Sequence, residues 1–304
     1  MPEPTDRNRF TDAATVGSYR LGSLAARLMP GPLATAAASS LGFGASFASP
    51  ARREMYQRHL RRVNPNLGRA AVRVATQTAF DSYARYYVES FRLPSLPKHA
   101  VERGFTKEGY REHVLPALER GNGVILALPH LGGWEWAGRW MTDQGHKLTV
   151  VVEPLDPPEL FEWFAELRRD LGMNVVPLGP TAGSTVLKAL RDNEVVCLLC
   201  DRDLDRTGVE VEFFGERTTL PPGPATLSLR TGAPILPTAV YFTPRYNGHH
   251  AIVRPPVPTQ RLGGLREDVG RVTQLLAREL EFLIRRAPEQ WHLFQPNWPS
   301  DPGY

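Results

Sequence analysis

The chain has 304 residues, of which 42% are hydrophobic, 22% charged and 9% aromatic. This composition is typical of a globular protein with one large domain, or a core plus a smaller subdomain, and it excludes a disordered tail, a collagen-like repeat and a disulfide-rich miniprotein. The formal charge is +4, and only four of the 36 basic residues are lysine. Arginine suits the binding of phosphates and anionic surfaces because its guanidinium group pairs bidentately with oxyanions, although the codon bias of a GC-rich genome explains the excess equally well.

The two cysteines indicate a reducing compartment. Cys197 and Cys200 both lie in the apolar run 195–200, which predicts a strand. Residues three apart on a strand face opposite sides and do not bridge readily. We therefore interpret both as small core residues.

The N-terminal region predicts helices near a membrane. The first thirteen residues carry five charges and no apolar core segment, so the sequence indicates no secretory signal. Residues 28–51 carry no charge, but Ala, Ser, Gly and Pro dominate them, which makes insertion across a bilayer unfavourable. One or two amphipathic helices at an interface and a helical hairpin packed on the core both fit this stretch.

A basic segment follows. Between residues 51 and 73 there are seven arginines and one acid. At helical spacing, one face is basic and the opposite face is apolar. The basic face holds Arg58, Arg61, Arg62, Arg69 and Arg73, and the apolar face holds Met55, Leu60 and Val63. The pattern favours contact with an anionic membrane surface, with a solvated face as the alternative, and no nucleic-acid motif accompanies it. We predict that residues 1–100 form a helical, membrane-associating segment and residues 101–304 an α/β core.

From residue 105 onward, strands alternate with helices. Apolar runs predict strands at 123–128, 146–152, 174–177, 194–200, 209–213, 233–242 and 249–253. Helices are predicted at 133–144, 157–171, 185–191 and 265–285. Fully apolar strands between helices indicate an α/β fold with a mostly parallel central sheet flanked by helices. Ligands of such sheets bind at the carboxyl ends of the strands.

The most informative turn follows the strand at 123–128. It places His130 between strand and helix and Glu135 in the first helical turn, with Gly132 and Gly133 between them. An imidazole at such a turn can act as a general base, and the backbone amides of 132–134 are candidates for stabilising an oxyanion. The alternative is a structural histidine beside an acid that the helix dipole stabilises at the N-terminus of the helix.

Two further strand ends carry polar residues. Asp201, Arg202 and Asp203 follow the strand at 194–200, and Glu153 follows the strand at 146–152, whose next helix carries Arg168. These groups are candidates for orienting a histidine or holding a polar substrate, or for an ion-pair network at the edge of the sheet. Arg168 and Arg202 are candidates for binding the phosphate of a lipid head group or of a donor, and each has a structural alternative.

Together these motifs resemble a known family. The spacing His130-x-x-x-x-Glu135 resembles the signature of glycerolipid-type acyltransferases. The segments 61–65, 201–204, 213–216, 222–225 and 288–291 resemble the bacterial lipid A lauroyl/myristoyl acyltransferase family, and 201–216 is most similar to its actinobacterial phosphatidylinositol mannoside branch. The likeness extends from about residue 58 to 298.

The resemblance implies transfer of a fatty acyl group from acyl-CoA to a sugar hydroxyl of a membrane glycolipid, at the cytoplasmic face of the cell membrane and without another cofactor. It implies that His130 is catalytic and that Asp201 orients it, with Glu135 as the rival partner. Glu153 and Arg168 match positions of the head-group pocket. The acid at 135 is Glu where relatives have Asp, and Leu131 begins a stretch that differs from theirs, so head-group specificity stays open.

Chemistry and rivals complete the prediction. A thioester has a good leaving group, so a single base that activates the alcohol is sufficient. No Gly-x-Ser-x-Gly or His-Glu-x-x-His motif occurs, which argues against a serine hydrolase and predicts no metal site. The alternative of another class is a catalytically silent lipid-binding protein. A His130 side chain within hydrogen-bond reach of a carboxylate and open to an apolar groove would favour the enzyme, whereas a plugged or groove-free site would favour the silent protein. Residues that could line the groove, or belong to the core instead, are Trp134, Trp136, Trp140, Phe161 and Trp163.

Overall fold

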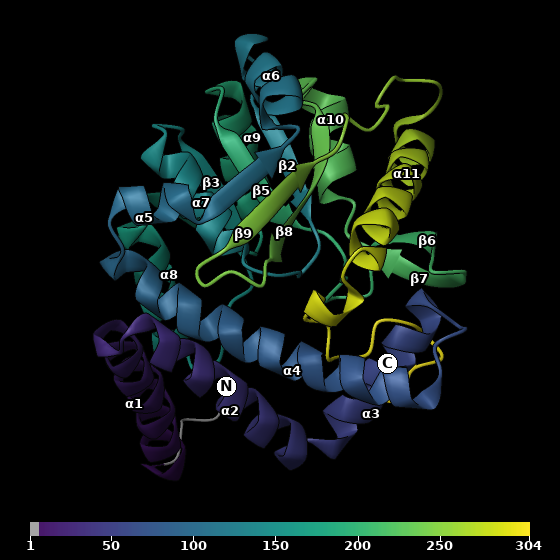
Figure 1. Ribbon diagram of the computed structural model, residues 1–304. Coiled ribbons are helices and arrows are strands. Elements are labelled where there is room, and N and C mark those ends of the chain that lie inside the picture. The colour runs from purple at the N-terminus through teal and green to yellow at the C-terminus, as the bar shows by residue number, and fades with distance from the viewer. Residues whose placement is uncertain (1–5) are drawn as a thin grey trace.

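A seven-stranded sheet organises the computed structural model, which describes residues 6–304 (Figure 1). The strand order is β1-β9-β8-β2-β5-β3-β4, and all neighbours run parallel except β8 and β9. The strands are β1 (Phe105–Glu108), β2 (Val124–Leu128), β3 (Leu148–Val152), β4 (Met173–Pro177), β5 (Val195–Leu199), β8 (Ile235–Phe242) and β9 (His249–Val253). The predicted α/β fold with a mostly parallel sheet is confirmed.

The central strands are apolar on both faces because both faces are covered. In β2, Ile125 and Ala127 belong to one hydrophobic cluster, whereas Leu126 and Leu128 belong to the cluster on the other side. This alternation follows from the two-residue repeat of a strand. The cysteines behave as predicted: Cys197 packs against one cluster, buried Cys200 belongs to the other, and both are free.

Helices cover both faces of this sheet. One cluster joins the sheet to α9 (Ala182–Arg191), α10 (Gly223–Thr231) and α11 (Leu265–Arg285), and the other joins it to α7 (Trp134–Asp143) and α8 (Pro158–Asp170). Short helices α5 (Lys98–Arg103) and α6 (Leu115–Glu119) and the turns η1 (Leu93–Ser95), η2 (Tyr110–Val114) and η3 (Pro288–Gln290) complete this region. Two helix starts carry stabilising features, namely Pro158 in the first turn of α8 and Glu267, which accepts the amide of Gly264 before α11.

Four long helices of the described residues 6–304 precede the short α5 and the sheet, in the region that the sequence predicts to be helical. They are α1 (Asp6–Leu28), α2 (Gly31–Ala48), α3 (Pro50–Val63) and α4 (Arg69–Arg92). Helix α4 crosses the ends of the strands, and α1 and α2 lie on the side of α4 that faces away from the sheet (Figure 1). No helix within residues 6–304 is long and apolar enough to cross a membrane.

The strand predicted at 209–213 lies outside the sheet. Strand β6 (Val209–Phe213) pairs with β7 (Glu216–Leu220) in a separate antiparallel hairpin that packs on α11. Strands β1 and β7 were not predicted, because both are short and half exposed and therefore lack an apolar run.

The basic segment is divided between surface and interior. Arg61 of α3 is exposed, but Arg62 points inward, where it bonds Glu216 at 2.8 Å and Asp301 at 2.6 Å and lies over the Trp298 ring. Treating Arg62 as part of a lipid-facing surface was therefore wrong. The guanidinium group fixes the C-terminal segment to α3 instead.

Candidate active site

The turn after β2 brings His130 to Asp201. Strands β2 and β5 are neighbours with Leu128 opposite Leu199, so the residues that follow them meet at the same edge. The His130 Nδ1 lies 2.7 Å from Asp201 Oδ1, and the His130 backbone amide donates to Asp201 Oδ2 at 3.0 Å. Two bonds to one carboxylate fix both the ring and its backbone. The pairing leaves Nε2 as the ring nitrogen directed away from Asp201.

Asp201 is completely buried, with an exposed fraction of 0%. Burial alone would raise the pKa of its carboxyl, but attraction to His130 and hydrogen bonds from His130 and Trp291 outweigh burial and lower that pKa below its usual value. The Trp291 indole donates to Oδ2 at 2.6 Å, and the Asn297 side chain donates to the Asp201 backbone oxygen at 3.0 Å. Asp201 is thus held as an ionised acceptor for the imidazole.

Glu135 has different partners. Its Oε1 accepts hydrogen bonds from Arg168 at 3.0 Å and from the Tyr86 hydroxyl at 2.6 Å. Its side chain is buried, and loss of solvent raises its pKa above the usual value despite the attraction of Arg168. Of the two carboxylates that the sequence left open as partners of His130, the structure places Asp201 beside the ring and joins Glu135 to Arg168.

The backbone amides of Gly132 and Gly133 in this turn already donate hydrogen bonds to backbone oxygens. The Gly132 amide donates to the Gln290 oxygen, and the Gly133 amide donates to the Val240 oxygen, both at 3.0 Å. The expectation that these two amides stabilise an oxyanion was wrong, because they tie the turn to η3 and β8. Gly132 has a φ of +62°, and a Cβ there would lie 1.9 Å from Val240 O, so the close approach requires glycine.

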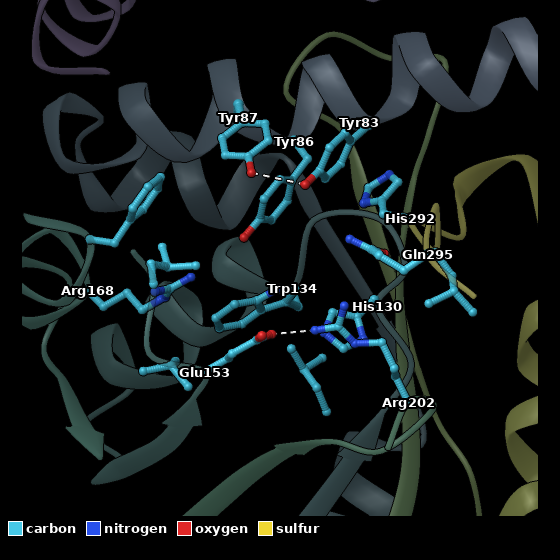
Figure 2. A pocket seen from close by; sticks show the side chains of 15 residues that line it. Tyr83, Tyr86, Tyr87, His130, Trp134, Glu153, Arg168, Arg202, His292 and Gln295 are labelled. Carbon is cyan, nitrogen blue, oxygen red and sulfur yellow. Dashed lines mark hydrogen bonds and ion pairs between the residues drawn. The ribbon is translucent and has the colours of Figure 1, made fainter. Parts of the chain in front are cut away.

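Two cavities meet at His130. The first, of about 310 Å³, lies between the strand ends and α4 (Figure 2). Its polar and aromatic lining is Tyr83, Tyr86, Tyr87, Trp134, Arg168, His292 and Gln295, and Val152, Leu155, Phe164, Leu199 and Leu293 add apolar surface. The second, of about 320 Å³, lies beside the loop after β5 and is lined mainly by apolar groups, including Val151, Leu178, Leu198, Leu204, Pro222 and Pro224. We call them the polar cavity and the apolar cavity. His130, Glu153 and Arg202 line both.

The other predicted site residues lie around these cavities. Arg202 donates to the Glu153 carboxylate, as the dashed line in Figure 2 shows. Asp203 lines the apolar cavity, and its Oδ2 accepts the Gly208 amide at 2.8 Å, so it also shapes the loop. Arg168 lies across the polar cavity from His130 (Figure 2).

The aromatic residues that the sequence left open between groove and core do not all take one role. Trp134 lines the polar cavity, but Trp136 and Trp140 are buried in the core, and neither Phe161 nor Trp163 lines the two cavities. Their place is taken by Phe164 and by three tyrosines of α4.

Several residues of the site escaped the sequence analysis. Tyr83, Tyr86 and Tyr87 repeat at helical spacing, which was an available signal. His292 lines the polar cavity, its backbone amide donates to the His130 oxygen at 2.7 Å, and its ring lies 2.9 Å from the Ser82 hydroxyl. Burial, and then the nearby His130, lower the pKa of His292 to about 3. Its neighbour Trp291 belongs to a segment that the resemblance had identified.

The mostly parallel α/β sheet places a histidine–carboxylate pair between a polar and an apolar cavity. This arrangement suits group transfer to a substrate that has a polar and an apolar part. The match to bacterial lipid A biosynthesis acyltransferases spans residues 8–300. The chain belongs to this family and is an acyltransferase-family enzyme.

Curated relatives agree with this assignment. A phosphatidylinositol mannoside acyltransferase of Mycobacterium tuberculosis is 38% identical over 300 residues, covering 97% of this chain and 92% of the relative. The enzyme of the same description from Mycolicibacterium smegmatis is 36% identical over 96% of this chain and 93% of its own length. A lipid A biosynthesis acyltransferase of Haemophilus influenzae is 26% identical over 59% of this chain and 55% of its own.

Proposed function

We infer that this chain transfers a long-chain fatty acyl group from acyl-CoA to a sugar hydroxyl of a membrane glycolipid, namely a phosphatidylinositol mannoside. The two relatives that align over nearly the whole chain carry that description, which supports the acceptor. The observation that carries the proposal is the position of the His130–Asp201 pair between a polar and an apolar cavity. A silent lipid-binding protein has no need of an oriented imidazole that opens to both.

The chemistry follows from the geometry. Asp201 accepts the Nδ1 proton of His130 and fixes the tautomer in which Nε2 is free to act as a base. Nε2 takes the proton of the acceptor hydroxyl as its oxygen attacks the thioester carbonyl carbon. The tetrahedral intermediate then collapses, the carbon–sulfur bond breaks, and the thiolate recovers the proton from His130. No covalent acyl-enzyme is required.

Each cavity suits one part of the substrates. Hydroxyl, amide, carboxylate and guanidinium groups of the polar cavity can hydrogen-bond a sugar head group, with Glu153 as an acceptor and Arg168 as a donor. The mainly apolar lining around Leu198 and Leu204 suits an acyl chain. Substrates at opposite sides of His130 would bring hydroxyl and thioester together at its ring.

The direct test is turnover of His130→Ala with long-chain acyl-CoA and purified phosphatidylinositol mannosides, followed by mass spectrometry of the products. We expect transfer to fall by at least about 10³-fold, while thermal unfolding and donor binding stay close to wild type. A folded variant with near-normal turnover would exclude His130 as the base. Failure of the wild-type protein with every glycolipid acceptor would exclude the proposed substrate class.

We further propose that α1 and α2 contact the membrane. Large apolar side chains are exposed on these two helices by 55–85%, namely Leu21, Leu24, Leu28, Leu33, Leu41, Phe43 and Phe47. Both helices lie on the outer side of α4, which lines the polar cavity (Figure 1). Exposure of such an apolar face to water is unfavourable, and the face suits the boundary between lipid head groups and acyl chains. Exposed Arg52 and Arg61 of α3 add attraction to anionic lipid.

Vesicle binding tests this surface. The double variant Phe43→Asp and Phe47→Asp should lose most co-sedimentation with vesicles containing anionic phospholipid, at both low and high salt. Replacing Arg52 and Arg61 by Ala should weaken binding at low salt only. Leu262→Asp is the matched control, because Leu262 is 73% exposed in the loop before α11. Equal binding by the double aspartate variant would exclude the proposed face.

A further inference from the structure

The expected oxyanion donors near His130 are largely committed elsewhere. The amides of residues 130 to 133 donate in turn to Asp201 Oδ2, Pro129 O, Gln290 O and Val240 O. Attack on a thioester nevertheless places a negative charge on the carbonyl oxygen, and a site without a donor for that charge loses much of its rate. Of the expected amides, only that of Trp134 has no acceptor among these bonds, so a side chain near His130 is the other candidate donor.

The Arg202 guanidinium is in a suitable place. Arg202 directly follows Asp201 and lines both cavities together with His130, so it lies where donor and acceptor would meet. Its side chain is 16% exposed, and its Nε is buried without a hydrogen-bond partner among residues 6–304. A buried N–H group without a partner is costly, so an acceptor oxygen on a bound substrate would satisfy this group.

Glu153 fixes the orientation of this group. Arg202 Nη2 donates to the Glu153 carboxylate, and this bond restrains one end of the guanidinium while Nε stays unused. A restrained donor stabilises a developing charge without having to reorganise during the reaction. The pair also neutralises the arginine in the resting site.

Arg168 also has an unpartnered Nε, but its position is different. It bonds Glu135 at 3.0 Å, lies over the Trp134 ring, and lines the polar cavity only. Figure 2 shows it at the end of that cavity away from His130. Arg168 is therefore placed to contact a head group rather than the reacting carbonyl.

The geometry points to Arg202 as a catalytic residue whose Nε–H stabilises the oxyanion of the tetrahedral intermediate. This inference rests on the proposed acyl transfer. When the acceptor oxygen bonds to the thioester carbon, the carbonyl electron pair moves to oxygen, where Arg202 donates a hydrogen bond. Collapse returns the pair to the carbonyl, the thiolate leaves, and His130 supplies its proton.

The kinetic test is Arg202→Ala, with Arg202→Lys as a second variant that keeps the positive charge. We expect kcat to fall by about 10²–10³ for Arg202→Ala, with KM for donor and acceptor changed only a few-fold. Millimolar guanidinium should restore part of the lost kcat, whereas sodium at the same ionic strength should not. Arg206→Ala is the control, because Arg206 is on the same loop, lines neither cavity and packs on Tyr304.

A binding measurement makes the test independent of turnover. Wild-type protein should bind a long-chain alkylphosphonate, whose tetrahedral anionic centre resembles the intermediate, more tightly than the planar ester of equal chain length. Arg202→Ala should lose most of this preference and Arg206→Ala should keep it.

Three results would overturn the inference: unchanged kcat with raised KM, which indicates phosphate binding only; a reduced kcat that guanidinium does not rescue; or a phosphonate preference that survives in Arg202→Ala. Unchanged kcat would transfer the role to the Trp134 amide. Failure of the proposed function appears separately, as absence of wild-type transfer.

Discussion

Asp201 and Glu135 are two buried carboxylates in the same site, and their proton affinities are shifted in opposite directions. Their exposed fractions are 0% and 2%. The pKa of Asp201 is lowered, although burial opposes this, whereas burial raises the pKa of Glu135 despite its ion pair with Arg168. Depth in the protein therefore does not decide the direction of the pKa shift.

The number of hydrogen bonds explains the difference. Both Asp201 oxygens accept bonds, from the His130 ring, the His130 amide and the Trp291 indole. Glu135 accepts its bonds from Tyr86 and Arg168 on one oxygen, and its Oε2 is buried without a partner in the described chain. A carboxylate that receives several donors keeps its charge in the interior, while one that receives fewer retains a larger desolvation cost.

The two carboxylates also differ in the groups that they contact. Asp201 touches the predicted base, whereas Glu135 holds Arg168 and Tyr86 in the wall of the polar cavity. We therefore expect substitutions of Asp201 to affect the reaction step and substitutions of Glu135 to affect binding of the acceptor.

The largest expected effect is on turnover. Asp201→Asn should lower kcat by about 10³–10⁴-fold, because the amide cannot hold the imidazole in the same tautomer. Glu135→Gln should lower kcat by about tenfold or less and act mainly on KM for the glycolipid. Initial rates over a range of acceptor concentrations measure both effects. A larger loss of kcat in Glu135→Gln than in Asp201→Asn would reverse the roles assigned here.

The sequence predicted the positions of both acids but not their partners. His130, Glu153 and Asp201 follow β2, β3 and β5, so the predicted parallel sheet placed them at the same end of the strands. Their proximity also depends on the position of β5 between β2 and β3, which the sequence did not predict. The choice between Asp201 and Glu135 depends on side-chain direction. Arg168 reaches Glu135 from α8, and a helix register of that kind cannot be deduced from strand ends.

What escaped prediction comes from long-range packing. The tyrosines of α4 line the polar cavity only because that helix crosses the ends of the strands, and Arg62 points inward only because the C-terminal segment returns to α3. A pattern of local spacing shows that a helix has two faces, but it does not show which later part of the chain will cover one of them.

The next effect in size is on stability, and the two acids should give opposite pH dependences. Because folding lowers the Asp201 pKa, its stabilising contribution is present above its unfolded pKa of about 3.9 and is lost as the pH falls through the folded value. The folded state raises the Glu135 pKa, so its contribution becomes less favourable as the pH rises above about 4.3.

Urea unfolding of wild type, Asp201→Asn and Glu135→Gln between about pH 3.5 and 7 measures this difference. The stability lost in Asp201→Asn should increase with pH and reach about 1–3 kcal/mol near neutrality. The loss in Glu135→Gln should decrease with pH. Parallel pH dependences in the two variants would show that the hydrogen-bond count does not set the sign.

The smallest expected effect comes from removing a single donor to Asp201. Trp291→Phe deletes the indole N–H that bonds Oδ2 at 2.6 Å, while the bonds from the His130 ring and amide stay. We expect kcat to fall by about tenfold or less. The acid limb of the pH–rate profile should move to higher pH, because the Asp201 carboxylate is less stabilised.

Trp298→Phe is the matched control: Trp298 is also buried, but its indole donates to the Phe213 oxygen at 3.1 Å. It should cost comparable stability without moving the acid limb. An equal shift in both variants would mean that packing around the C-terminal tryptophans, rather than the bond to Oδ2, holds Asp201 in its ionised form.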